Sequence, residues 1–169
     1  MTATPTTDSR VGDGGESAAM HALTDQGAVE SLVARLGNLH PQRPRAWGRM
    51  TPNEMLCHLA DAFELALGTR PFAAIDTWWS RTVLRRVALH TKMTWPRGLE
   101  TPPEVAQGMG GSAPAAFDQD RARVIELLRR FATTDRPSPT HPVFGQLTRD
   151  EWMIWAYRHV DHHLRQFAL

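Results

Sequence analysis

Three histidines fall within five residues near the end of the chain, in the stretch RHVDHHLRQF (residues 158–167), whereas the whole 169-residue sequence has only eight. On a helix, positions i and i+4 lie roughly 6 Å apart on one face, so the imidazoles of His159 and His163 can bind one divalent metal ion. By spacing alone, His162 could replace His163. The alternative interpretation is a partly exposed helix end, where protonated histidines interact favourably with the helix dipole.

Two histidines do not complete a metal site, and the candidate third ligand is His58, in the stretch NEMLCHLADAF. A helical arrangement of this stretch places Met55, Leu59 and Phe63 on a broad apolar arc, with His58 at its edge. A histidine in that position can face a cleft between helices, or it can simply form a hydrogen bond to a neighbouring helix. The remaining histidines are predicted in a tail, in loops or at a helix end and are assigned no role: His21, His40, His90 and His141.

Apolar residues that recur every three or four positions predict the helices that carry these histidines. Two helices have a clear start, because Thr51 with Glu54 and Thr148 with Glu151 each match a capping box. Gly68 is expected to end the first of these two. The first predicted helix begins near Asp25. The other four cover residues 52–67, 76–93, 118–132 and 149–167.

Two segments rich in Pro and Gly, residues 95–117 and 134–147, are predicted to be irregular connections, the first with a short turn of helix. No stretch shows the period-two alternation of a sheet. The predicted fold is therefore all-α, an up-and-down four-helix bundle with one or two extra short helices. Residues 1–24 carry little to bury and are expected to form a mobile tail, and residues 25–169 a single domain.

The composition is ordinary for a soluble globular protein, with 41% hydrophobic and 22% charged residues. A formal net charge of +1 gives no field that would indicate a nucleic-acid partner. Cys57 is the only cysteine, so no disulfide can form within the chain. No apolar stretch suits a signal peptide or a membrane span, and a cytoplasmic location is expected.

The stretch HVDHHLRQ resembles the H-x-x-x-H-x-x-Q motif of the DinB-like, or YfiT-like, superfamily of metal-binding helical bundles. That superfamily couples the motif to one histidine near the start of the second bundle helix, where MTPNEMLCHLADAFELALG has its own. TPPE and HPVFGQLTRDEW are similar to an uncharacterised branch, a domain of unknown function. Over residues 29–169 the resemblance implies three metal ligands, His58, His159 and His163, with Gln166 as an orienting residue. Many members have arginine where this chain has Leu164.

The resemblance also implies a function. Three imidazoles leave a coordination position open, as in catalytic metal sites. Zinc or nickel is the expected ion, and iron or copper also binds imidazole. The superfamily implies a transferase that depends on a low-molecular-weight thiol such as mycothiol, bacillithiol or glutathione, acting on a small-molecule substrate. The alternatives are a metal-dependent hydrolase and a non-catalytic metal-binding or ligand-binding stress-response bundle. Homodimers are common in the superfamily.

Several further residues are assigned provisional roles around this site. Asp61, Glu54 and Asp161 are candidate acceptors for the free ring nitrogens of the ligands. Cys57 precedes His58, but consecutive helical residues point about 100° apart, so a buried structural cysteine is expected rather than a nucleophile. Basic residues of the helix at 76–93 either bind carboxylates of the thiol or form a solvated face: Arg81, Arg85 and Arg86. Tryptophans either line a pocket or fill the core: Trp78, Trp79, Trp95, Trp152 and Trp155.

Overall fold

The computed structural model describes residues 21–98 and 109–169, and this part of the chain is mainly helical, as predicted. No helix within it has the length and apolar character needed to cross a membrane. The elements in chain order are α1 (Gln26–Gly37), α2 (Pro52–Ala66), the π-helical turn η1 (Ser80–Leu84), α3 (Arg85–His90), α4 (Phe117–Ala132), β1 (Thr140–His141), β2 (Gly145–Gln146) and α5 (Arg149–Arg165).

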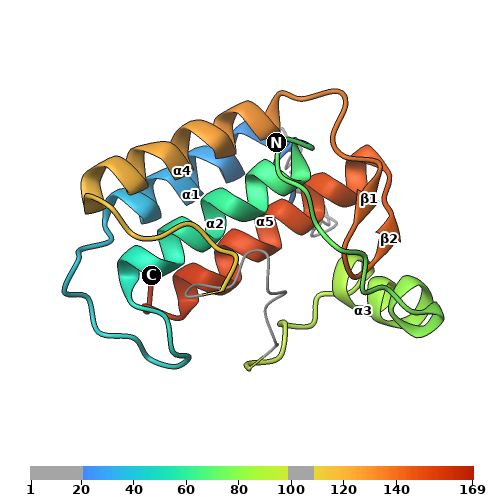
Figure 1. Cartoon of the computed structure of the whole chain (residues 1–169), viewed down its shortest axis with the longest axis horizontal. Helices are drawn as coiled ribbons and strands as arrows, with labels where there is room; N and C mark the ends of the chain where they lie inside the picture. The colour runs from blue at the N-terminus through green and yellow to red at the C-terminus, as the bar shows by residue number, and fades with distance from the viewer. Residues whose placement is uncertain (1–20, 99–108) are drawn as a thin grey trace, which may run out of the picture.

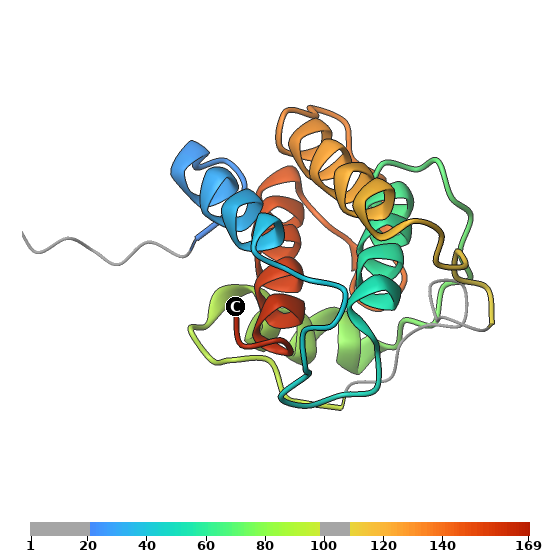
Figure 2. The ribbon, with the colours of Figure 1, turned by 90° about the vertical axis from the view of Figure 1, so that its left-hand side faces the viewer.

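Helices α1, α2, α4 and α5 lie side by side along the molecule (Figure 1). Each of α4 and α5 packs against both α1 and α2, and Figure 2 shows the four helices from one end. Their buried apolar side chains form one core. The largest side chains that are fully buried in this core include Trp152, Phe131, Leu32 and Leu59. Burial of their apolar surface is the main force that holds the four helices together.

Both predicted capping boxes are present. In α2, the Thr51 hydroxyl accepts a hydrogen bond from the Glu54 backbone N–H, and the Glu54 carboxylate accepts one from the Thr51 N–H. Thr148 and Glu151 make the same reciprocal pair at the start of α5. Gly68, with φ of +74°, follows the end of α2 as predicted. These local interactions explain why the starts of both histidine-bearing helices agree with the sequence.

The helix predicted over residues 76–93 is present in a shorter form, from Trp78 to His90, with η1 continuing directly into α3. Thr77 and Ser80 cap its start through reciprocal hydrogen bonds between backbone N–H and hydroxyl groups. α3 packs against α5, and Trp95 donates its indole N–H to the carbonyl oxygen of Ala88. This segment therefore lies beside the histidine-bearing face of α5.

The prediction that the chain has no sheet is wrong for residues 140–146, which form a short antiparallel hairpin. Its two-residue strands are too short to show a period of two in the sequence. Gly145 has φ of +68°, and a Cβ there would lie 2.8 Å from Cδ of Arg81, so the turn requires glycine. The hairpin lies against the η1 segment and places His141 over α5.

The packed part of the chain begins earlier than the predicted boundary at residue 25. Leu23 is buried in the core, and its backbone N–H donates to the Met153 carbonyl oxygen of α5. A single apolar residue before the first helix gives no periodic signal, which is why the sequence placed it in the tail. Residues 1–20 of the predicted tail, and residues 99–108 of the connection at 95–117 in which a short helical turn was expected, lie outside the described residues.

Candidate metal centre

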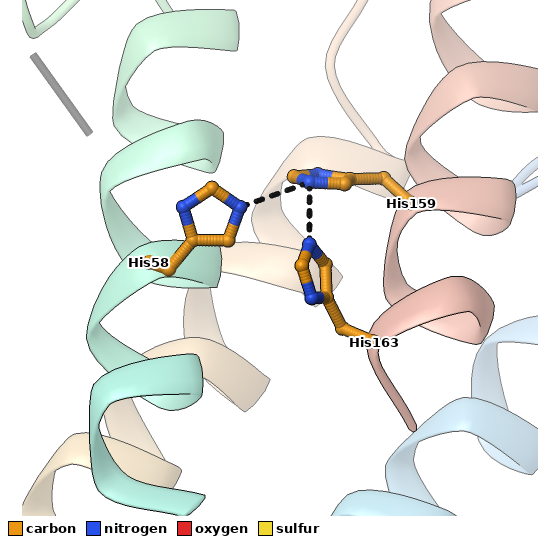
Figure 3. Close-up of side chains that lie close together, drawn as sticks. All are labelled: His58, His159 and His163. Carbon is orange, nitrogen blue, oxygen red and sulfur yellow. Dashed lines mark hydrogen bonds between the residues drawn. The ribbon is translucent and has the colours of Figure 1, made fainter. Parts of the chain in front are cut away.

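Three histidine side chains from two helices converge on one point (Figure 3). His58 extends from α2, and His159 and His163 extend from successive turns of α5. The Nε2 atom of His159 lies 3.1 Å from Nε2 of His58 and 3.1 Å from Nε2 of His163. One ring nitrogen of each residue lies within 4.8 Å of the others, so the three can hold a metal ion.

The spacing and protonation of these nitrogens both suit a metal ion. Two nitrogen ligands at about 2.0–2.1 Å from a tetrahedral zinc ion lie about 3.3 Å apart, close to the observed separations. Burial lowers the pKa of both His159 and His163 well below the ordinary value, and repulsion from neighbouring imidazoles lowers it further. Neutral imidazoles have the free lone pair that a metal ligand needs. His159 and His163 therefore need not lose a proton near neutral pH to bind a metal ion.

Gln166 determines which nitrogen of His163 is free. Its Oε1 atom lies 3.0 Å from Nδ1 of His163, and because an amide oxygen only accepts, Nδ1 carries the hydrogen. The lone pair of His163 is then on Nε2, which points to the other two histidines. Gln166 is held in turn by the loop before α2: Ala46 donates to its backbone carbonyl oxygen, and a Cβ on Gly48 would lie 3.2 Å from its Nε2.

Replacement of Gln166 by leucine is expected to weaken metal binding roughly 10- to 100-fold, because His163 loses the acceptor that orients its ring. Gln166→Glu keeps an acceptor at the same position and should retain the affinity of the wild type. Competition titrations with a chromophoric zinc chelator measure both variants. Equal losses in the two variants would show that Gln166 acts through packing and not through its hydrogen bond.

His162 does not belong to the cluster, although the spacing left it as an alternative to His163. Its ring makes an edge contact with Trp47, at 4.9 Å between centroids, and lies 5.9 Å from Trp95. The ring centre of its neighbour His163, in contrast, lies 4.7 Å from that of His58. The packing of α2 against α5 selects between the two neighbours.

The acidic residues proposed as acceptors for the histidines have other partners. Asp61 is fully buried and accepts hydrogen bonds from Arg70 and from both the backbone and the hydroxyl of Ser112. Glu54 caps α2, and Asp161 forms ion pairs with Arg35 and Arg165. Arginines therefore engage Asp61 and Asp161, whereas Glu54 lines the same cavity as the three histidines.

A cavity of about 1400 Å³ adjoins the three histidines, and all three contribute to its wall. Most of the wall is apolar or aromatic, with contributions from α2, α3, α5 and the hairpin. Among the described residues, Arg49 is the only arginine or lysine in it. Aliphatic and aromatic lining residues include Leu65, Leu84, Val87, Met93, Trp95, Phe144 and Trp155. Such a wall suits a small molecule with a large apolar part.

The structure decides which of the residues with provisional roles line the cavity. None of the three arginines of the basic face lines the cavity: Arg81 pairs with Asp76, Arg85 pairs with Glu151, and Arg86 is exposed. Trp95 and Trp155 line the cavity, Trp152 belongs to the core, and Trp78 and Trp79 are exposed. Cys57 is buried as predicted, and burial first, then nearby Asp120 and Asp61, raises the pKa of its thiol to about 11.

His141, for which the sequence predicts no role, lies in the wall of the same cavity. Its ring is buried among Phe144, Trp152 and Trp155, with centroid distances of 4.7, 5.3 and 5.1 Å. The sequence signal was its position in HPVFGQLTRDEW, between a proline-rich loop and a capping box. The sequence pattern predicts only a loop residue at this position, because the aromatic rings around His141 come mainly from α5.

The fold and the histidine cluster define a mainly helical protein with three histidines that can hold a metal ion in the wall of a large, mostly apolar cavity. The chain belongs to the family DUF1569, described as a protein of unknown function, whose model matches residues 21–169. No curated protein and no solved structure matches the chain.

Proposed function

We propose that His58, His159 and His163 bind a divalent metal ion, zinc or nickel first, and that the protein is an enzyme that acts on a small molecule in the adjoining cavity. This proposal rests on the convergence of three buried or partly buried imidazoles at one cavity wall. When bound with an open coordination position, such an ion lowers the pKa of a coordinated thiol or water and stabilises the negative charge that forms. We also propose membership of the DinB-like superfamily of helical bundles, on the basis of the H-x-x-x-H-x-x-Q motif.

The proposed reaction is transfer to or from a low-molecular-weight thiol. The cavity of about 1400 Å³ exceeds the roughly 300–1000 Å³ of a typical single-ligand site, so a thiol and a second reactant fit together. The apolar wall would bind the second reactant, and Arg49 at the rim would bind a carboxylate of the thiol, a role that the basic face of residues 81–86 does not fill. In transfer to a chlorinated aromatic, a sulfur–carbon bond forms, chloride leaves and the thiol proton passes to solvent.

The test is turnover of 1-chloro-2,4-dinitrobenzene with a panel of thiols, with zinc or nickel and in metal-free protein. At least one thiol should give a rate that depends on both metal and protein. Cys57→Ala should keep this rate, because the Cys57 thiol is buried and its raised pKa keeps it protonated. No rate above the metal-free control with any thiol would reject the transferase.

Two other outcomes identify the alternatives. Metal-dependent hydrolysis of an aryl ester in the absence of thiol would indicate a hydrolase at the same centre. Tight metal binding with neither activity would indicate a non-catalytic binding protein.

A further inference from the structure

The ring of His141 is held in one tautomer by the hairpin. Its Nδ1 atom lies 3.1 Å from the backbone nitrogen of Val143 and 3.2 Å from that of Phe144. Backbone N–H groups only donate, so Nδ1 accepts both hydrogen bonds, and the hydrogen of the neutral ring is on Nε2. Burial lowers the pKa of His141 to about 3, so the ring stays neutral at physiological pH. His141 therefore presents one N–H donor in a fixed direction.

That donor is accessible from the cavity. Because the two backbone donors occupy Nδ1, Nε2 is the ring nitrogen of His141 left for a ligand. The residue as a whole is 6% exposed. The cavity beside the histidine cluster is where His141 meets open space. A neutral donor in a mostly apolar wall is a favourable partner for a hydrogen-bond acceptor on a ligand.

Aromatic side chains connect this donor to the metal centre. The ring centre of Trp155 lies 5.1 Å from that of His141 and 4.9 Å from that of His159. The distance between the His141 and His159 rings therefore cannot exceed the sum of these two distances. Trp155 is inclined by 30° to His159, and Trp95 lies 6.2 Å from the same imidazole. A small aromatic molecule that contacts these rings can reach His141 and still lie beside the centre shown in Figure 3.

We propose that the cavity binds a small aromatic molecule with a carbonyl or similar acceptor oxygen, and that the Nε2–H of His141 donates a hydrogen bond to this oxygen. This inference deepens the proposed function, since it names the class of the second reactant. Donor and metal centre would hold the reactant in one orientation. The inference does not require a bound metal, because the donor, the hairpin and the aromatic wall all belong to the chain.

The test compares two probes of nearly equal shape, acetophenone and α-methylstyrene, of which only acetophenone has an acceptor oxygen. Their dissociation constants are measured by NMR titration of the full chain, both metal-free and zinc-loaded. His141→Asn is the variant, because its side-chain oxygen can still accept from the backbone N–H groups of Val143 and Phe144, whereas the donor at the far end of the ring is lost. Wild-type protein should prefer acetophenone over α-methylstyrene, and His141→Asn should reduce this preference roughly tenfold, as measured by the ratio of the two dissociation constants.

A second measurement uses wild-type protein only, so it does not depend on correct folding of the variant. In wild-type protein labelled with ¹⁵N at histidine, acetophenone should shift the Nε2 resonance of His141, and α-methylstyrene should not. An unchanged ratio in His141→Asn, or the same Nε2 shift with both probes, would overturn the inference. The metal-free titration separates the proposed metal centre from the proposed role of His141. If His141 donates the hydrogen bond, the ratio of the two dissociation constants is the same with and without metal.

Discussion

Protein with His159→Ala is expected to purify without stoichiometric metal and to bind added zinc several hundred-fold more weakly than the wild type. His159 is the central member of the cluster, because its Nε2 is 3.1 Å from the ring nitrogens of both His58 and His163. Complete zinc sites bind with roughly 10–16 kcal/mol, so one of three or four ligands accounts for about 3–4 kcal/mol. Elemental analysis of untagged protein and competition with a chelator measure the two quantities.

The matched control is His162→Ala, which removes an imidazole from the same helix, three residues away, but outside the cluster. This variant should keep the metal content of the wild type. Thermal unfolding of both metal-free variants establishes that each is folded. Equal metal occupancy in His159→Ala and wild type would overturn the assignment of the site, and equal losses in the two variants would show that the effect is not specific to the cluster.

Glu151→Gln is expected to lower the free energy of unfolding at pH 7 by about 3 kcal/mol. The Glu151 carboxylate is buried and accepts two hydrogen bonds from Arg85, at 2.8 and 2.5 Å. Nε2 of His90 lies 3.1 Å from one of its oxygens. Glutamine at this position preserves the capping box with Thr148 but removes the charge that binds Arg85. Because Arg85 belongs to α3 and Glu151 to α5, the loss also loosens the segment that forms one wall of the cavity.

The pH dependence of unfolding gives an independent measure of the same interaction. Burial alone would raise the pKa of Glu151, but hydrogen bonds from Arg85, Thr148 and His90 outweigh it and lower the pKa from 4.5 to about 2. A folded-state pKa below the unfolded value contributes stability above pH 4.5 that is lost as the pH falls towards 2. The shift corresponds to about 3 kcal/mol. Denaturant titrations from pH 7 to pH 2 should show this loss in the wild type and not in Glu151→Gln.

Glu54→Gln is the control for this prediction, because Glu54 occupies the same capping-box position in α2 without an arginine partner among the described residues. Its change in stability should stay below about 1 kcal/mol, the usual range of a charge at a helix N-terminus. If both glutamine variants lost the same free energy, the capping geometry and not the ion pair with Arg85 would account for the effect.

The starts of α2 and α5 could be predicted because their causes are local. Thr51 and Glu54, like Thr148 and Glu151, are three residues apart, and each pair satisfies its own helix terminus without help from the rest of the fold. The hairpin at residues 140–146 could not be predicted, because its two short strands are stabilised by contacts with Arg81 and with the α5 tryptophans. For the same reason, sequence patterns did not decide which of the tryptophans line the cavity and which fill the core.

The sequence by itself determined that His159 and His163 share a helical face and that His58 lies at the edge of an apolar stripe, because both properties depend only on helical periodicity. Helical spacing did not distinguish His163 from His162, since both lie within one turn of His159, and only the motif resemblance favoured His163. In the structure, the packing of α2 against α5 decides between them, because it brings the ring centre of His58 to 4.7 Å from that of His163. Tertiary structure also decided the position of His141, because the neutral donor it presents depends on backbone contacts within the hairpin and on aromatic rings from a different element.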